Sequence, residues 1–229
     1  MRRGCVVSKL AVVLGLTVVG SCMVDVADAG AQVGGRGRRQ SSSDPSYWVG
    51  LSIGYVEGMT TSDNKSDATW QFGYTSQIRA TLEKALQPGV TLGISAGFSN
   101  PPLTYNGSGF DANCPGSCHA HADVSQYLAF VNVGGRPTYG FHGGFTLEGG
   151  VTQFSNFRDD ITDARLATAS SSYDFTFGVG GGPGYNLSSS MDLYAVAGWD
   201  MILHPQSSTV TAQRPPQMTT FNVGVRVGF

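Results

Sequence analysis

The chain has 229 residues, of which 41% are hydrophobic and only 13% are charged, and its formal net charge is −2. That charge gives no reason to expect a nucleic-acid partner, and no glycine-rich phosphate-binding motif stands between a strand and a helix, so no cofactor is expected. Glycine is abundant, with 32 residues, and the mean hydropathy is −0.05, which fits strands that each average an apolar face against a small, polar one.

Residues 1–29 are predicted to be a signal peptide. A basic start precedes an unbroken run of apolar or small residues from Leu10 to Val19. This run is too short to cross a bilayer as a helix, which needs about 20 residues, but it has the length of a signal-peptide core. Two processing routes stay open. Cleavage after Ala29 would use the small side chains of Ala-Asp-Ala, whereas lipidation of Cys22 would use Val-Gly-Ser-Cys, which resembles a lipobox.

Residues 30–46 are expected to form a disordered linker. They are rich in Gly, Ser and Arg and show no apolar periodicity. Such a composition does not bury enough apolar surface to fold. Residues 47–229 remain, which is the length of a single domain.

From Tyr47 onward, apolar residues alternate with small or polar ones, which is the period of a β-strand. The alternation predicts eight strands: Tyr47–Glu57, Thr69–Lys84, Val90–Ser99, Asp123–Gly135, Tyr139–Phe154, Ser172–Tyr185, Met191–Leu203 and Met218–Phe229. Each has at least the 9–11 residues that a tilted strand needs to cross a bilayer.

Two sets of outward-facing residues are assigned on this pattern. The fourth strand is the least regular, because Gln126 and Asn132 share a face with apolar residues. Its outward face is predicted to be Tyr127, Ala129, Val131 and Val133. Aromatic residues expected at the membrane interfaces are Tyr47, Trp70, Tyr173 and Trp199.

The connections alternate in length along the chain. The short ones are Ala85–Gly89, Gly135–Thr138 and Asn186–Ser190, and the longer ones are Gly58–Ala68, Asn100–Ala122, Ser155–Ser171 and His204–Gln217. Short turns at one end and longer loops at the other are typical of a membrane barrel. A water-soluble barrel of the lipocalin type, with the apolar face turned inward, has the same period. The loop alternation and the aromatic-rich strand ends favour the membrane barrel.

The last strand alternates without error and ends the chain on Phe229. This ending resembles the C-terminal signal by which outer-membrane proteins are recognised for insertion, with matches at Asn222, Gly224, Val227 and Phe229. Tyr47 to Phe229 as a whole resembles the small eight-stranded outer-membrane proteins, the OmpA-transmembrane-domain and OmpX-like class. The resemblance implies an all-β, eight-stranded antiparallel up-and-down transmembrane β-barrel in the outer membrane of a Gram-negative-type cell, with both termini in the periplasm.

The same resemblance implies a structural or surface-interaction role without enzymatic activity. The expected partners are outer-membrane lipids, lipopolysaccharide, the barrel-insertion machinery and an extracellular partner that contacts the loops. The chain ends at the eighth strand, so no domain that binds the cell wall is expected. Two alternatives stay open: a narrow gated pore for small solutes, and a lipid-modifying enzyme with its site at the outer loops.

Charged residues on the inward faces are expected to pair inside the barrel, because a low-dielectric interior penalises an isolated charge. This predicted lumen network consists of Arg79, Glu83, Glu148, Asp174 and Arg226. An eight-stranded barrel is only wide enough for side chains to fill. The network is therefore interpreted as a plug, with the gated pore as the alternative.

The longest loop carries the most distinctive local cluster. Cys114 and Cys118 flank a Pro-Gly turn, and in an exported chain they are predicted to form a disulfide. His119 and His121 follow directly, and with the two sulfurs they have a spacing that zinc or copper could use, which makes them weak metal candidates.

The enzyme alternative rests on histidines near the rim. The candidates are His119, His121 and His204, with Asp123, Asp159 and Asp160 nearby. Nucleophilic catalysis requires a base within hydrogen-bond reach of a nucleophile and a third group that orients it. The spacing shows no such arrangement, so no catalytic residue is assigned.

Overall fold

The computed structural model describes residues 45–63, 68–106, 114, 116–134, 140–166, 172–205 and 215–229. The signal peptide expected over residues 1–29 and all but the last two linker residues lie outside this part, as does the turn expected at Gly135–Thr138. The described residues are all-β, and they contain no helix that is long and apolar enough to cross a membrane.

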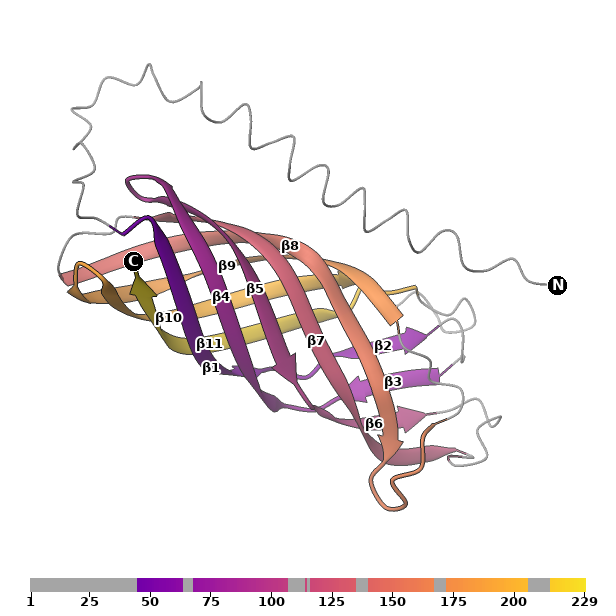
Figure 1. Ribbon diagram of the computed structural model, residues 1–229. Helices are drawn as coiled ribbons and strands as arrows, with labels where there is room; N and C mark the ends of the chain where they lie inside the picture. The colour runs from indigo at the N-terminus through magenta and orange to yellow at the C-terminus, as the bar shows by residue number, and fades with distance from the viewer. Residues whose placement is uncertain are drawn as a thin grey trace. The chain divides into compact units, whose positions relative to one another are not determined.

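Eight strands close into a barrel (Figure 1). They are β1 (Tyr47–Val56), β4 (Thr75–Gln87), β5 (Val90–Ser99), β7 (Ser117–Gly134), β8 (Gly140–Asp159), β9 (Ser172–Ser188), β10 (Met191–Leu203) and β11 (Gln217–Gly228). Each pairs antiparallel with its neighbours in the chain order of the barrel, and β1 pairs with β11 to join the first strand to the last. The predicted eight-stranded antiparallel up-and-down barrel is confirmed.

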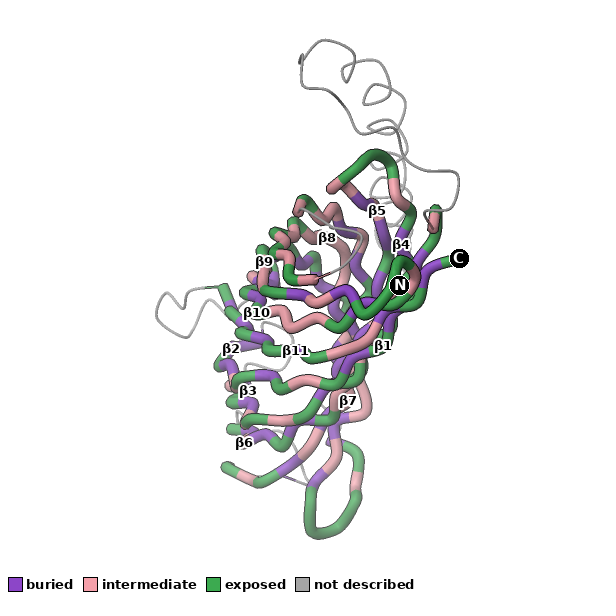
Figure 2. Tube along the Cα trace, turned by 90° about the vertical axis from the view of Figure 1, so that its left-hand side faces the viewer, coloured by how far each residue is buried: buried purple, intermediate pink, exposed green. Residues whose placement is uncertain are grey.

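Burial alternates along the barrel strands (Figure 2), and large apolar side chains are among the exposed residues. Ile53 is 64% exposed and Phe145 is 50% exposed, whereas Ser52 is 3% exposed. In the irregular strand β7, Tyr127 is 44% exposed and Gln126 is fully buried, as its predicted outward face requires. The water-soluble alternative needed the apolar face to line the lumen, and the burial pattern excludes it.

The chain segment expected as one strand over Thr69–Lys84 is two strands. β3 (Ala68–Phe72) and β4 are separated by Gly73 and Tyr74. The buried face switches across this joint: Phe72 is buried, whereas Tyr74 is 60% exposed. The prediction of one strand was wrong because the alternation of apolar residues continues across the point where the chain changes direction. At that point Gly73 N donates a hydrogen bond to Pro102 O at 2.7 Å, and the chain turns away from the barrel.

A three-stranded extension, which we call the cap, lies beyond one end of the barrel (Figure 1). It consists of β2 (Thr60–Asp63), β3 and β6 (Pro102–Asn106), and its sheet order is β2-β3-β6-β7. Two segments expected to be loops therefore contain strands: Gly58–Ala68 includes β2, and Asn100–Ala122 includes β6 and the start of β7. We call this end of the barrel the mouth and the end with the short connections the turn end.

The cap has an apolar core of its own. Trp70 is fully buried, so its expected place at a membrane interface is wrong. It packs at 4.6 Å from Phe157 and 6.2 Å from Phe154, measured between ring centroids. The buried cluster comprises Val56, Met59, Ala68, Trp70, Phe72, Leu103, Tyr105, Cys114, Ala120, Ala122, Val124, Phe154, Phe157, Leu166, Ile202 and Met218. Cap strands and the mouth ends of barrel strands thus share one core.

The seam between β7 and β8 closes the barrel, and a glycine makes it tight. Gly150 lies opposite Leu128, and a Cβ at this position would be 2.1 Å from the backbone oxygen of Tyr127. We expect Gly150→Ala to lower the free energy of unfolding by about 1–3 kcal/mol, because backbone cannot move aside cheaply. Urea unfolding in detergent measures this. Gly149→Ala is the matched control, since its nearest atom would be 3.7 Å away; equal midpoints for the two variants would contradict the tight seam.

Candidate functional site

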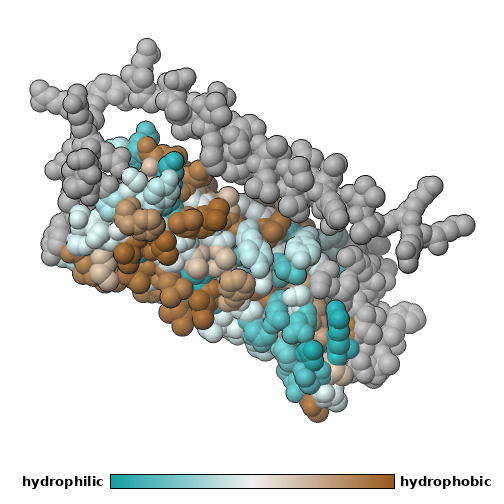
Figure 3. Space-filling model, in the orientation of Figure 1, coloured by the Kyte–Doolittle hydropathy of each residue, from teal (hydrophilic) through white to brown (hydrophobic). Residues whose placement is uncertain are grey.

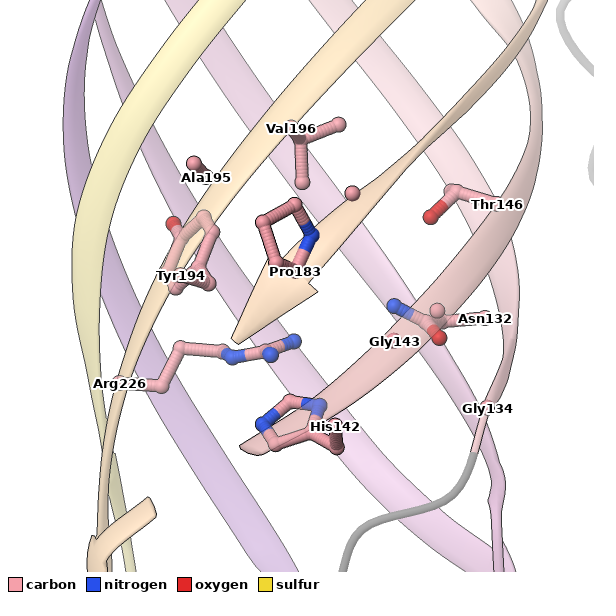
Figure 4. A pocket seen from close by; sticks show the side chains of 12 residues that line it. Asn132, Gly134, His142, Gly143, Thr146, Pro183, Tyr194, Ala195, Val196 and Arg226 are labelled. Carbon is pink, nitrogen blue, oxygen red and sulfur yellow. The ribbon is translucent and has the colours of Figure 1, made fainter. Parts of the chain in front are cut away.

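The lumen is filled by charged side chains in three layers. The first, the turn-end layer, is built around Arg226 of β11 (Figure 4). Its Nη1 donates to Glu83 Oε1 at 3.1 Å and its Nε donates to Asp192 Oδ2 at 3.0 Å. His142 Nε2 lies 2.9 Å from the other oxygen of Asp192, and the guanidinium stacks 4.5 Å from the centre of the Tyr194 ring. The charge of Arg226 is thereby balanced by Glu83 of β4 and Asp192 of β10 together.

The middle layer joins four strands. Arg79 of β4 forms an ion pair with Glu148 of β8 at 3.1 Å. Gln126 of β7 accepts from Arg79 Nη2 at 3.3 Å and from Gln77 Nε2 at 2.9 Å, and it donates to Asp200 Oδ2 of β10 at 3.2 Å. Buried charges are tolerated when they are paired and hydrogen-bonded in this way. The layer therefore bridges the barrel from one wall to the other.

A cavity of about 60 Å³ lies between these two layers. Both arginines line it, together with polar side chains such as Ser95, Thr220 and Asn222. A buried water needs roughly 10–15 Å³, so the space is large enough for a few waters. A second cavity of about 20 Å³ lies beside His142 at the turn end (Figure 4).

The mouth layer contains Asp174, which the structure places apart from the other predicted lumen charges. Its Oδ2 is 2.8 Å from His204 Nδ1 and accepts a hydrogen bond from Ser172 Oγ at 3.0 Å. On its other side, His204 Nε2 is 3.4 Å from Asp63 Oδ1 of β2. All three side chains of the Asp63–His204–Asp174 cluster are nearly inaccessible, with 4%, 1% and 3% exposed.

Burial and pairing act in opposite directions on His204. Burial alone lowers the pKa of the imidazole, but hydrogen bonds and Coulombic attraction from Asp174 and Asp63 outweigh it and raise the pKa to about 9. The ring is therefore protonated at neutral pH, with Nδ1 hydrogen-bonded to Asp174 at 2.8 Å and Nε2 in a longer ion pair with Asp63 at 3.4 Å. It has no free lone pair with which to act as a general base.

The other rim candidates are also held apart. His119 and His121 lie on strand β7 and not in a loop, and His121 Nδ1 is 2.8 Å from Asp160 Oδ1. Asp123 accepts from Asn100 Nδ2 at 2.7 Å. Asp159 organises a turn, and the backbone N–H of Thr162 at its carboxylate lowers the pKa of Asp159. Among the described residues, the side chains that pair with His121 and His204 are aspartates, and neither ring is hydrogen-bonded to a serine, threonine or cysteine.

Cys118 and the metal candidates His119 and His121 lie on opposite faces of β7. Cys114 and Cys118 form a disulfide with their Cα atoms 5.8 Å apart. Cys118 pairs across the sheet with buried Tyr105, whereas His119 is exposed. The part of the chain that the structure describes contains no group of three or more His, Cys, Asp or Glu side chains placed to hold a metal ion.

The terminal strand places the residues of the expected insertion signal on both faces. Asn222 is 3% exposed and faces the lumen, whereas Val227 and Phe229 are 49% and 69% exposed on the outer wall. Phe229 stacks on Tyr47 with ring centroids 6.2 Å apart. Its carbonyl accepts hydrogen bonds from the N–H groups of Ser46 and Tyr47, both at 3.1 Å.

Some lumen residues were not assigned from sequence. Alternation does put His142, Asp192 and Asp200 on inward faces, so listing every charged inward residue would have found them. Asp63 could not be found in this way, because its strand lies in a segment without an apolar period. Its role depends on the fold of the cap.

The closed barrel and its paired lumen define the class: the chain has the fold of the small eight-stranded outer-membrane β-barrels. Among solved structures, Neisserial surface protein A is 12% identical, with 80% of this chain and 97% of that chain covered and a TM-score of 0.53. The outer membrane protein OprG from Pseudomonas aeruginosa is 14% identical, with 81% and 97% covered and a TM-score of 0.51. No protein-family model matches the chain, and the comparison with curated proteins gives no match. At these identities the likeness establishes the fold alone.

Proposed function

We propose that the protein is a non-enzymatic integral outer-membrane β-barrel, closed to solutes, with a structural and surface-interaction role. The observation that carries this proposal is the inverted distribution of polarity. Large apolar side chains are exposed on all eight barrel strands, while the paired charges are buried inside. On the face that Figure 3 shows, hydrophobic residues gather over the barrel. The largest apolar patch of a soluble monomer is usually about 300–600 Å², so a continuous apolar wall fits lipid as its solvent.

Aromatic side chains support a bilayer interface at each end of this wall. Tyr47 and Phe229 stack at the turn end, and Tyr55 and Tyr74 stack at the mouth with ring centroids 5.5 Å apart. Aromatic belts mark membrane–water interfaces in barrels. With short turns on the periplasmic side, as is usual, β1 begins and β11 ends in the periplasm, and the cap faces outward.

The partners follow from this placement. Outer-membrane lipids and lipopolysaccharide contact the wall, and the insertion machinery recognises the terminal strand through Asn222, Gly224, Val227 and Phe229. An extracellular partner would meet the mouth end, where hydrophilic surface gathers (Figure 3).

A preformed turn at that end supports surface contact. Asp159 Oδ1 accepts hydrogen bonds from the N–H groups of Ile161 and Thr162, at 3.1 and 2.8 Å. Arg158 Nη1 donates to both the backbone and the carboxylate of Asp163, which has a φ of 55°. Left-handed backbone outside glycine persists where the surroundings fix it. The turn therefore presents Ile161, which is 89% exposed, on a rigid support.

Planar-bilayer recording tests the closed lumen. We expect the purified, folded protein to insert and to show no discrete conductance steps, because the turn-end and middle layers fill the barrel. Steps that change in size when Arg79 or Glu148 is neutralised would contradict the proposal and establish a pore. Insertion is checked in the same sample by protease protection of the barrel strands.

A further inference from the structure

The β2–β3 hairpin of the cap is attached to the rest of the protein along one strand edge, through two joints and through the apolar core that Trp70 and Phe72 share with β8. β2 is the outermost strand of the sheet, and β3 is joined to β6 by four residue pairs, from Thr69↔Asn106 to Phe72↔Leu103. The hairpin connects to the barrel through two short joints outside strands, residues 57–59 and 73–74. Gly58 in the first joint has no room for a side chain, since a Cβ would be 2.2 Å from the carbonyl oxygen of Phe72. Such an element could move about its joints as a unit.

The far end of this hairpin meets the barrel rim at His204. The ring directly follows β10 and lies between Asp63, the last residue of β2, and Asp174 of β9. Trp70 of β3 covers it, with the two ring centroids 5.0 Å apart, and Phe154 of β8 packs at 6.1 Å. One imidazole thus connects the hairpin, through Asp63, to the barrel, through Asp174.

We propose that His204 is a latch that holds the β2–β3 hairpin closed over the mouth, and that the hairpin opens as a unit when the latch is lost while the barrel stays folded. The arrangement fits a latch because one carboxylate, Asp63, belongs to the hairpin and the other, Asp174, belongs to the barrel. Removing the imidazolium leaves Asp63 and Asp174 buried together as like charges, which drives the hairpin away from the rim.

The latch depends on the charge of the ring. In the described part of the chain the charged groups acting on His204 are Asp63 and Asp174, while β3 and β8 contribute aromatic rings. Folding around the two carboxylates raises the pKa of His204 from 6.5 to about 9. A raised pKa stabilises the closed form fully below the unfolded value, and this contribution is lost as the pH rises through about 9. Only the part of this shift that Asp63 supplies acts on the closing equilibrium, because Asp174 stays beside His204 on the barrel when the hairpin opens.

Opening would expose the aromatic underside of the cap. Trp70 is fully buried in the closed form, and Phe157 is 1% exposed. Both would face solvent at the mouth after opening, together with the polar residues of the middle layer below. The latch therefore controls which surface a partner meets at the mouth: a polar surface when the hairpin is closed, and an aromatic one when it is open.

Quenching of Trp70 fluorescence by acrylamide tests the latch. The protein has three tryptophans, so a Trp48→Phe, Trp199→Phe background leaves Trp70 as the single reporter. In this background, refolded in detergent, we expect Trp70 to be shielded at pH 7 and to become several-fold more quenchable above about pH 9. His204→Gln should be equally quenchable at pH 7 and at pH 10, and Asp63→Asn should weaken shielding without touching the barrel.

His142→Gln is the matched control, because this histidine also pairs with a lumen aspartate but in the turn-end layer. It should leave Trp70 shielded at pH 7. Retention of the unheated, fast-migrating band on SDS gels shows that each barrel is folded. Equal quenching of the parent, His204→Gln and Asp63→Asn at pH 7 would overturn the latch, as would loss of the folded band in step with Trp70 exposure, which would mean that the cap and barrel open together.

Discussion

Replacing Arg226 with Met should destabilise the barrel by about 3–5 kcal/mol, which is the cost of breaking a buried ion pair by removing one partner. The guanidinium is 7% exposed and is bonded to both Glu83 and Asp192. Without it, Glu83 and Asp192, each 2% exposed or less, lose the guanidinium that they share. Urea unfolding in lipid vesicles, followed by the mobility of the folded band, measures the loss.

Lys84→Met is the control for removal of a cation from the same end. Lys84 Nζ lies 5.7 Å from the centre of the Tyr47 ring on the outer surface, and an exposed substitution of this kind usually changes stability by less than about 0.5 kcal/mol. If Arg226→Met costs no more than Lys84→Met, the turn-end layer does not stabilise the barrel.

Replacing Trp70 with Ala should unfold the cap and leave the barrel closed. A buried Trp→Ala change costs about 3–5 kcal/mol, and Trp70 is fully buried between Phe72, Phe154 and Phe157. This loss of stability is large for the cap, because the cap consists of only three short strands. Hydrogen exchange should therefore show faster amide exchange in β3 and β6 and unchanged protection in β1 and β11.

Trp199→Ala is the matched control on the outer wall. Trp199 is 39% exposed on β10, so its removal deletes contacts with lipid or detergent and leaves the cap core intact. Protection in β3 and β6 should stay at the parent level. Uniform loss of protection across cap and barrel in Trp70→Ala would show that the two share one cooperative unit.

The sequence predicted the barrel well because its signal is local. Alternation over ten residues is enough to define a strand and its two faces, and Met191–Leu203 was predicted with the bounds that the structure has. The inward positions of Arg79, Glu148 and Arg226 followed from the same period. Which charges meet was not predictable, since contacts across the lumen depend on the stagger between strands that are far apart in the chain.

The cap was missed for a related reason. Trp70 and Phe72 continue the alternation of the strand that follows, so sequence gives no sign that their face turns inward at Gly73. Their burial depends on rings from β8 that lie more than eighty residues away. His204 was recognised as a rim histidine, but its pairing with Asp63 required the cap to be folded first.

The central claim is that the apolar wall is outside because lipid surrounds it. The most direct measurement is the mobility on SDS gels of protein from an outer-membrane fraction, compared between unheated and boiled samples. A faster unheated band that shifts on boiling is the expected result, because a closed membrane barrel resists the detergent until it is heated. Protein that is soluble in the periplasm and shows no shift would contradict the account.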